Sequence, residues 1–187
     1  ANNQKAHVDI SVNITEEKLK RALNSLIPND IYVKNAKIVQ DDFHARFMVK
    51  RKEYVYILNM GEYDPIKRNY EYQYCKKLDV DKMKEAIKYM EGTHDFQNLS
   101  SNEIKEKSTI KTIYSAKIKK EKDKLIFTFC GNGFLRYMVR VMVGVLIEVG
   151  KGKIDVDDIP LIIDGTYNKN YKKVANPEGL YLNNVEY

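Results

Sequence analysis

The stretch from Cys130 to Gly150 contains the charged residues whose spacing is most suggestive of chemistry. Arg136 and Arg140 are four residues apart within an apolar run that has helical periodicity over 134–149. Residues at that separation share one side of a helix. A guanidinium on such a helix can face a carboxylate or phosphate, or it can pair structurally or extend to solvent. The spacing alone leaves both interpretations open.

Glycines mark both ends of this predicted helix and one point inside it. Gly131-Asn132-Gly133 offers a sharp turn and a capping side chain before the helix, and Gly150-Lys151-Gly152 offers a glycine terminator after it. Gly144 lies one turn beyond Arg140, where the lack of a side chain would let another backbone segment approach closely. The helix is therefore expected to pack tightly near Arg140.

A second set of polar residues lies in a predicted strand over 46–58. It combines Lys50, Arg51 and Lys52 with Tyr54 and Tyr56, which alternate onto one face. Basic side chains beside aromatic rings suit RNA, because bases stack on rings and phosphates pair with cations. An ordinary solvated strand face has the same composition, so the pattern does not decide between the two.

Composition narrows the functional class. The chain has 187 residues, 32 of them basic and 26 acidic, and its net charge of +6 is a mild indication of a polyanionic partner. Only two cysteines and three scattered histidines are present, which argues against a disulfide framework and against a metal site. The arginines interrupt the longest apolar run, so no membrane span is expected and a cytoplasmic protein is predicted.

Strand and helix patterns alternate along the chain and include a hairpin, which predicts an α+β fold with helices packed on one face of a sheet. A polar loop is expected over 97–108. The predicted strands are 7–12, 31–39, 46–58, 70–75, 110–120, 125–130 and 180–186, and the predicted helices are 15–26, 79–90, 134–149 and 155–163.

Several short motifs occur in order along nearly the whole chain. They are Ala22-Leu23-Asn24 with Pro28-Asn29-Asp30-Ile31, Asp42-Phe43-His44-Ala45-Arg46-Phe47, Tyr54-Val55-Tyr56-Ile57, Gly92-Thr93-His94-Asp95-Phe96, Phe134-Leu135-Arg136-Tyr137-Met138-Val139-Arg140 with Val143-Gly144 and Glu148-Val149-Gly150, and Ala175-Asn176-Pro177-Glu178-Gly179-Leu180-Tyr181-Leu182. No single motif is specific, but the whole set in this order resembles the bacterial tRNA pseudouridine synthase A family.

The resemblance implies the pseudouridine synthase fold, a mixed, mostly antiparallel sheet with helices on one face. It implies isomerisation of uridine to pseudouridine in the anticodon arm of tRNA, by a homodimer that uses no cofactor or metal. Arg140 would pair with the nucleophilic aspartate, Tyr54 would be the active-site tyrosine, and Leu180 would contact the base. Candidates for phosphate contacts are Arg46, Lys50, Arg51, Lys52 and Arg136.

The family's nucleophile lies in a glycine-arginine-threonine-aspartate motif, and no aspartate of this sequence resembles it. Residues 1–68 are accordingly expected to be the rest of an N-terminal catalytic half and 69–187 the C-terminal half. We expect the 187 residues alone to be inactive, as an incomplete part of the enzyme. Two other classes stay open, namely a non-catalytic α+β RNA-binding module and a structural or interaction domain.

Overall fold

The computed structural model describes residues 1–101 and 108–187, which form two compact units. The larger unit comprises residues 1–4 and 49–187, and the smaller one comprises residues 5–48. The predicted loop over 97–108 begins with a short 3-10 helix, η2 (Gln97–Leu99), and its residues 102–107 lie outside the described part.

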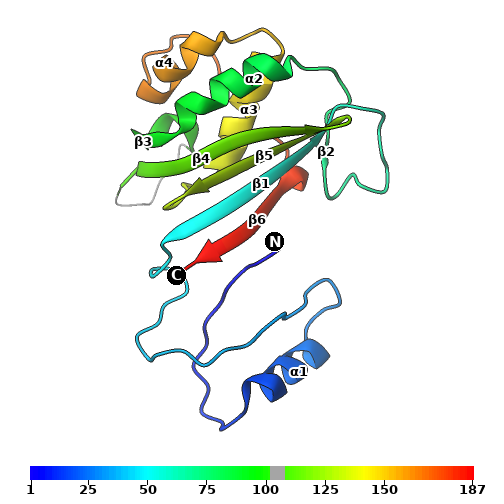
Figure 1. Ribbon diagram of the computed structural model, residues 1–187, viewed down its shortest axis with the longest axis vertical. Coiled ribbons are helices and arrows are strands. Elements are labelled where there is room, and N and C mark those ends of the chain that lie inside the picture. The colour runs from blue at the N-terminus through cyan, green and yellow to red at the C-terminus, as the bar shows by residue number, and fades with distance from the viewer. Residues whose placement is uncertain (102–107) are drawn as a thin grey trace. The chain divides into compact units, whose positions relative to one another are not determined.

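A six-stranded sheet forms the larger unit (Figure 1). Its strand order is β2-β1-β5-β4-β3, and β6 pairs with β1 beside β2. The β1–β2 pair is parallel and the other pairs are antiparallel, which confirms the predicted α+β fold with a mixed, mostly antiparallel sheet. The strands are β1 (Arg51–Asn59), β2 (Tyr72–Gln73), β3 (Gly92–Asp95), β4 (Ile110–Glu121), β5 (Lys124–Gly131) and β6 (Leu180–Glu186).

Helices cover one side of this sheet (Figure 1). The first is α2 (Val80–Ala86), which begins at Asp79 because that carboxylate accepts a hydrogen bond from the Lys82 amide at 3.1 Å. The remaining helical segments are η1 (Ile87–Met90), α3 (Met138–Gly150), η3 (Val156–Asp158), α4 (Ile159–Asp164) and η4 (Pro177–Gly179). The predicted helices over 79–90 and 155–163 are confirmed, each as a 3-10 segment joined to an α-helix.

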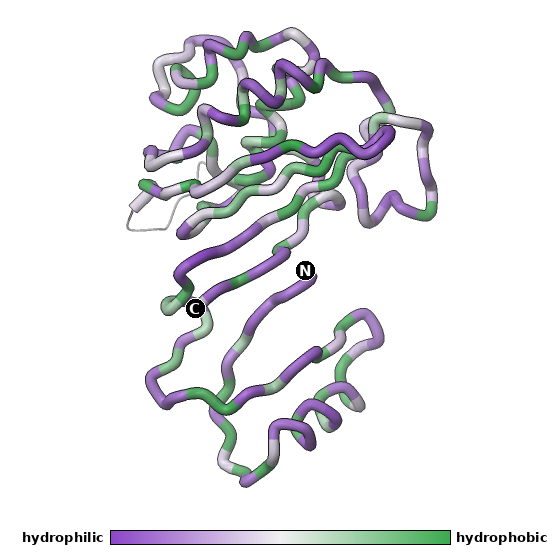
Figure 2. The backbone as a smooth tube through the Cα atoms, viewed as in Figure 1, coloured by the Kyte–Doolittle hydropathy of each residue, from purple (hydrophilic) through white to green (hydrophobic). Residues whose placement is uncertain are grey.

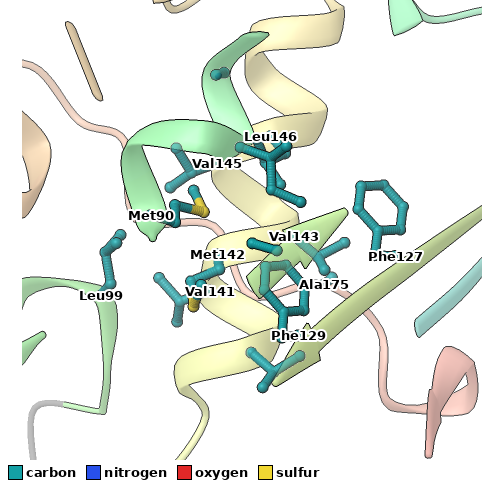
Figure 3. Packing of buried hydrophobic residues seen from close by; sticks show 14 of the residues in the cluster. Met90, Leu99, Phe127, Phe129, Val141, Met142, Val143, Val145, Leu146 and Ala175 are labelled. Carbon is teal, nitrogen blue, oxygen red and sulfur yellow. The ribbon is translucent and has the colours of Figure 1, made fainter. Parts of the chain in front are cut away.

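The core lies between α3 and the sheet (Figure 3). Alternation along β5 turns Phe127 and Phe129 toward α3, and both rings are fully buried. Met142 and Val143 from the helix belong to the same buried cluster. Burying each such side chain is worth about 1.5–3 kcal/mol, so this layer dominates the stability of the unit.

The first residues of the chain lie beside β6, the strand on the far side of β1 from β5. The Asn2 amide donates to the Leu182 carbonyl at 2.8 Å. The side chains of Asn2 and Asn3 bond those of Asn183 and Asn184 at 3.0 and 2.8 Å. The segment 1–4 thus continues the sheet's hydrogen bonding beyond β6.

In the described chain the smaller unit contains one regular element, α1 (Glu16–Leu26), which confirms the helix predicted over 15–26 and is capped by Thr15. No residue of α1 is buried, although its sequence alternates apolar and polar faces (Figure 2). The predictions of strands over 7–12 and 31–39 are wrong, because neither segment has a strand ladder in the described chain. Alternation shows that a segment suits a sheet, but a strand forms only where a partner supplies hydrogen bonds.

Three further predictions need correction. The predicted strand over 46–58 begins only at Arg51, so Arg46 is not part of it. Residues 92–95, for which no strand was predicted, form β3 against β4. The helix begins at Met138 rather than at 134, so Arg136 precedes it and does not share a helix face with Arg140. The residue immediately before the helix is Tyr137, rather than a residue of the predicted Gly131-Asn132-Gly133 turn.

Candidate active site

Tyr54 lies on β1 with its ring against Phe134, the two ring centroids being 5.0 Å apart and nearly perpendicular. Its neighbours across the sheet are Phe129 on β5 and Leu182 on β6. Burial raises the pKa of the Tyr54 phenol above its ordinary value of 10.0. The hydroxyl is therefore protonated at neutral pH, where it can donate a hydrogen bond or a proton, and its half-buried ring offers a stacking surface.

Arg140 is the only residue of α3 that is not buried. Its Nε donates to the Ala175 carbonyl at 2.7 Å, and the Ala175 amide donates back to the Arg140 carbonyl at 3.0 Å. The described chain supplies no hydrogen bond or ion pair to its two Nη atoms. This leaves one edge of the guanidinium fixed and the other edge available for a carboxylate.

Gly144 leaves room for the segment that contains Ala175 to approach Arg140, and the sequence predicted such a close approach at this glycine. A Cβ atom at Gly144 would lie 2.0 Å from the Lys173 carbonyl oxygen and 3.4 Å from the Ala175 nitrogen. Only glycine allows the segment over 173–175 to run this close to α3. The apolar helix thus fixes the position of Ala175, and Ala175 fixes that of Arg140.

Leu180 is held by the next part of the same segment. Gly179 packs on β1, where a Cβ atom would lie 2.5 Å from the Ile57 carbonyl oxygen and 2.8 Å from the Tyr56 ring. The Tyr56 hydroxyl donates to the Asn176 carbonyl at 2.6 Å. Leu180 then pairs with Tyr56 across the β1–β6 ladder and is half buried.

Tyr56 connects the three residues predicted to act at the site. It is on the same face of β1 as Tyr54 and opposite Leu180 in the ladder. The Tyr56 hydroxyl donates to the Asn176 carbonyl, and the preceding residue, Ala175, accepts from Arg140 Nε, so both side chains are bound to the same short segment. Burial and the nearby phenol of Tyr72 raise the Tyr56 pKa. The structure therefore brings Tyr54, Arg140 and Leu180 to one region of the sheet.

The predicted phosphate contacts are more dispersed. Lys50 and Lys52 flank Arg51, which alternation turns to the face opposite Tyr54, where it lies 3.8 Å from Glu186 and 5.0 Å from the Tyr114 ring centre. Arg136 lies 5.2 Å from the Tyr137 ring centre, and Arg46 belongs to the smaller unit. Of the candidates on β1, only Lys52 is on the same face as Tyr54.

Two residues of the region were not among the predicted site residues. Tyr56 was taken with Tyr54 as an aromatic face for RNA, but it is fully buried and cannot stack on a base. Tyr137 received no role, because a left-handed backbone at a helix start leaves no mark in the sequence. The proline and glycine of Asn176-Pro177-Glu178-Gly179 were the available signal for the tight turn before Leu180.

Among residues 1–101 and 108–187, no group of three histidine, cysteine or acidic side chains is arranged to hold a metal ion. In the same residues, the longest helices are too short or too polar to cross a membrane.

The comparisons with known proteins agree with the geometry. The sequence profile of the family described as tRNA pseudouridine synthase matches residues 86–187. The tRNA pseudouridine synthase A of Limosilactobacillus reuteri is 39% identical over 99% of this chain and 73% of its own length. The tRNA pseudouridine synthase A 1 of Bacillus cereus is 41% identical over 100% of this chain and 76% of its own length. The tRNA pseudouridine synthase A of Anoxybacillus flavithermus is 40% identical over 98% of this chain and 75% of its own length.

The profile defines the class of the protein, and the relatives, which match nearly the whole chain, define the branch within that class. The chain belongs to the tRNA pseudouridine synthase A family of isomerases. It spans about three quarters of the length of these relatives.

Proposed function

We propose that the protein acts in the isomerisation of uridine to pseudouridine in the anticodon arm of tRNA. The observation that carries this proposal is the state of Arg140, whose Nε is bound to Ala175 while its Nη atoms have no partner in the described chain. A half-buried arginine in that state suits a carboxylate held in a pocket. A non-catalytic RNA-binding module would not need such an arrangement beside Tyr54.

In this reaction the bond between ribose and a uracil nitrogen breaks, the base turns, and a bond to a uracil carbon replaces it. The family's aspartate must be ionised to begin the reaction. Arg140 keeps the carboxylate pKa low and fixes its direction, because an opposite charge favours the ionised form. Two parallel hydrogen bonds from the Nη edge would orient both carboxylate oxygens.

Tyr54 and Leu180 then act on the base. The Tyr54 ring stacks on uracil, and its protonated hydroxyl exchanges a proton with the base as the new bond forms. Leu180 packs against the base and limits the volume in which it can turn. Phe134 packs edge-on against the Tyr54 ring and would hold its orientation.

Five basic residues are proposed to bind the tRNA backbone, in a homodimer that works in the cytoplasm. Lys50, Arg51, Lys52, Arg46 and Arg136 are the candidates. The proposed halves, 1–68 and 69–187, would share one sheet, since β1 pairs with both β5 and β6. Binding through phosphates predicts a tRNA affinity that falls steeply with salt, because counterions are released.

The test uses two proteins. One is the chain of 187 residues, and the other, called the extended chain, has a segment with the family's glycine-arginine-threonine-aspartate motif joined to Ala1. Both are incubated with unmodified tRNA, and carbon-linked uridine is detected by chemical labelling. We expect product only with the extended chain. Product from the shorter chain would refute the assigned nucleophile, and no product from either would refute the proposed function.

A further inference from the structure

We propose that Tyr137 is a positioning residue for Arg140, a role that rests on the proposed function of that arginine. Tyr137 is the residue immediately before α3. Its ring centre lies 5.0 Å from the Arg140 Cζ atom. The two residues are three apart, so they are neighbours on the first turn of the helix. An aromatic ring at this distance attracts a guanidinium.

The backbone conformation of Tyr137 supports a specific role for the contact between its ring and Arg140. Its φ of 62° lies in the left-handed region, which a bulky side chain rarely adopts. The residues that cap the starts of α1 and α2, Thr15 and Asp79, have extended conformations and accept hydrogen bonds from the first turn. Tyr137 makes no side-chain capping bond, and only its backbone carbonyl, which accepts from the Val141 amide at 2.9 Å, takes part in the start of the helix. Its side chain is therefore not used to cap the helix.

Burial does not account for the conformation either. The Tyr137 side chain is 41% exposed, whereas the next two residues, Met138 and Val139, are buried. Strained backbone of this kind persists when the surrounding structure fixes it, and it is concentrated at functional sites. The arrangement that accompanies the strain is a ring beside two arginines, with Arg140 at 5.0 Å on the helix and Arg136 at 5.2 Å before it. Of these two, Arg140 is the one held by Ala175.

The ring adds the restraint that the Ala175 carbonyl lacks. One hydrogen bond to Nε fixes the position of that nitrogen but leaves the guanidinium plane free to tilt about it. A ring against the guanidinium opposes the tilt. Together, the two contacts hold the orientation of the Nη edge, which must be accurate to about 10–20° for a preorganised site.

The ring contact can be tested on the chain itself, without any reaction, by NMR of the Arg140 Nε–H group. In Tyr137→Leu, we expect hydrogen exchange at this Nε–H to become about 2- to 5-fold faster, the effect of losing one cation–π contact. Tyr137→Phe keeps the ring and should exchange at the wild-type rate. Tyr137→Asn removes the ring but tolerates the left-handed backbone, so it should behave as Tyr137→Leu even if leucine destabilises the turn.

A matched control is available at Tyr114, whose ring centre also lies 5.0 Å from an arginine, Arg51. Tyr114 is 47% exposed, close to the exposure of Tyr137. Tyr114→Leu should shift the Nε–H signal of Arg51 and leave that of Arg140 unchanged. Unchanged Arg140 exchange in both Tyr137→Leu and Tyr137→Asn would overturn the proposal, as would an equal change in Tyr137→Phe.

Turnover gives a second measurement. In the extended chain, Tyr137→Leu should lower kcat by about 10- to 100-fold with little change in KM, because the nucleophile's partner is misdirected while tRNA still binds. If Tyr137 had only a structural role, the loss of turnover in Tyr137→Leu would be matched by a proportional drop in the thermal midpoint. In that case Tyr137→Phe would not restore turnover. If the wild-type extended chain makes no product, the proposed function fails, while the NMR measurement still decides the role of Tyr137.

Discussion

Replacing Gly144 with alanine would test whether the helix–loop contact positions Arg140. The new Cβ atom would lie 2.0 Å from the Lys173 carbonyl oxygen, and ordinary contact begins at 3.4 Å, so the two must separate by 3.4 − 2.0 = 1.4 Å. The atoms in conflict are backbone atoms, which no change of rotamer can move. The segment over 173–175 must therefore shift away from α3.

The cost follows from two opposing effects. Overpacking of a tight contact costs about 1–3 kcal/mol. Alanine in a helix interior recovers about 0.5–1 kcal/mol relative to glycine. Because the overlap at Gly144 is large, we expect a net loss of about 2 kcal/mol. For a protein of this size, that lowers Tm by roughly 4–8 °C.

The local effect should be larger than the global one. A shift of 1.4 Å away from α3 would lengthen the bond from Arg140 Nε to the Ala175 carbonyl, now 2.7 Å, beyond hydrogen-bonding range. The assay is thermal unfolding of Gly144→Ala combined with hydrogen exchange at the Ala175 amide, which should lose protection. Gly133→Ala is the control, since its Cβ atom would meet only the end of the Lys111 side chain at 3.7 Å. Wild-type Tm and an equally protected Ala175 amide would refute the reasoning.

Three more predictions concern single side chains. Tyr54→Phe in the extended chain should bind tRNA normally but lose about 10²–10⁴-fold in single-turnover rate, whereas Tyr54→Leu should also lose about 1–3 kcal/mol of binding; normal rates in both would remove Tyr54 from the site. Arg140→Lys and Arg140→Met should each abolish most turnover while circular dichroism shows an intact fold. The hydrogen bond from Lys151 to Glu148 raises the Lys151 pKa above 10.5. The Tm difference between wild type and Glu148→Gln should therefore persist below pH 10.5. It should vanish at higher pH, as the lysine of the folded protein deprotonates.

The sequence predicted the elements that rely on local signals. The Asp79 cap, the hairpin between β4 and β5, and the last strand all appear within a residue or two of their expected bounds. Gly144 was correctly expected to permit a close approach, because a glycine within a strongly apolar helix has few other uses. Each of these features is determined by neighbouring residues.

The failures share a different cause. Residues 7–12 and 31–39 have the alternation of strands, but a strand needs a ladder partner, which local sequence cannot supply. The start of α3 was placed four residues early, because the apolar periodicity continues through Phe134 while the backbone is still turning. The consequence was functional, since it wrongly put Arg136 and Arg140 on one helix face.

The role of Arg140 shows what kind of information the sequence lacked. An apolar helix with an embedded arginine is compatible with both a structural pair and an active-site cation. We propose the second because Arg140 alone in α3 escapes burial and because, among its side-chain nitrogens, only Nε has a hydrogen-bonding partner in the described chain. That partner, Ala175, is 35 residues away and can approach only because Gly144 lacks a side chain. The arginine's role thus depends on a glycine one turn along the same helix, and the substitution at Gly144 tests that dependence without touching any group proposed to react.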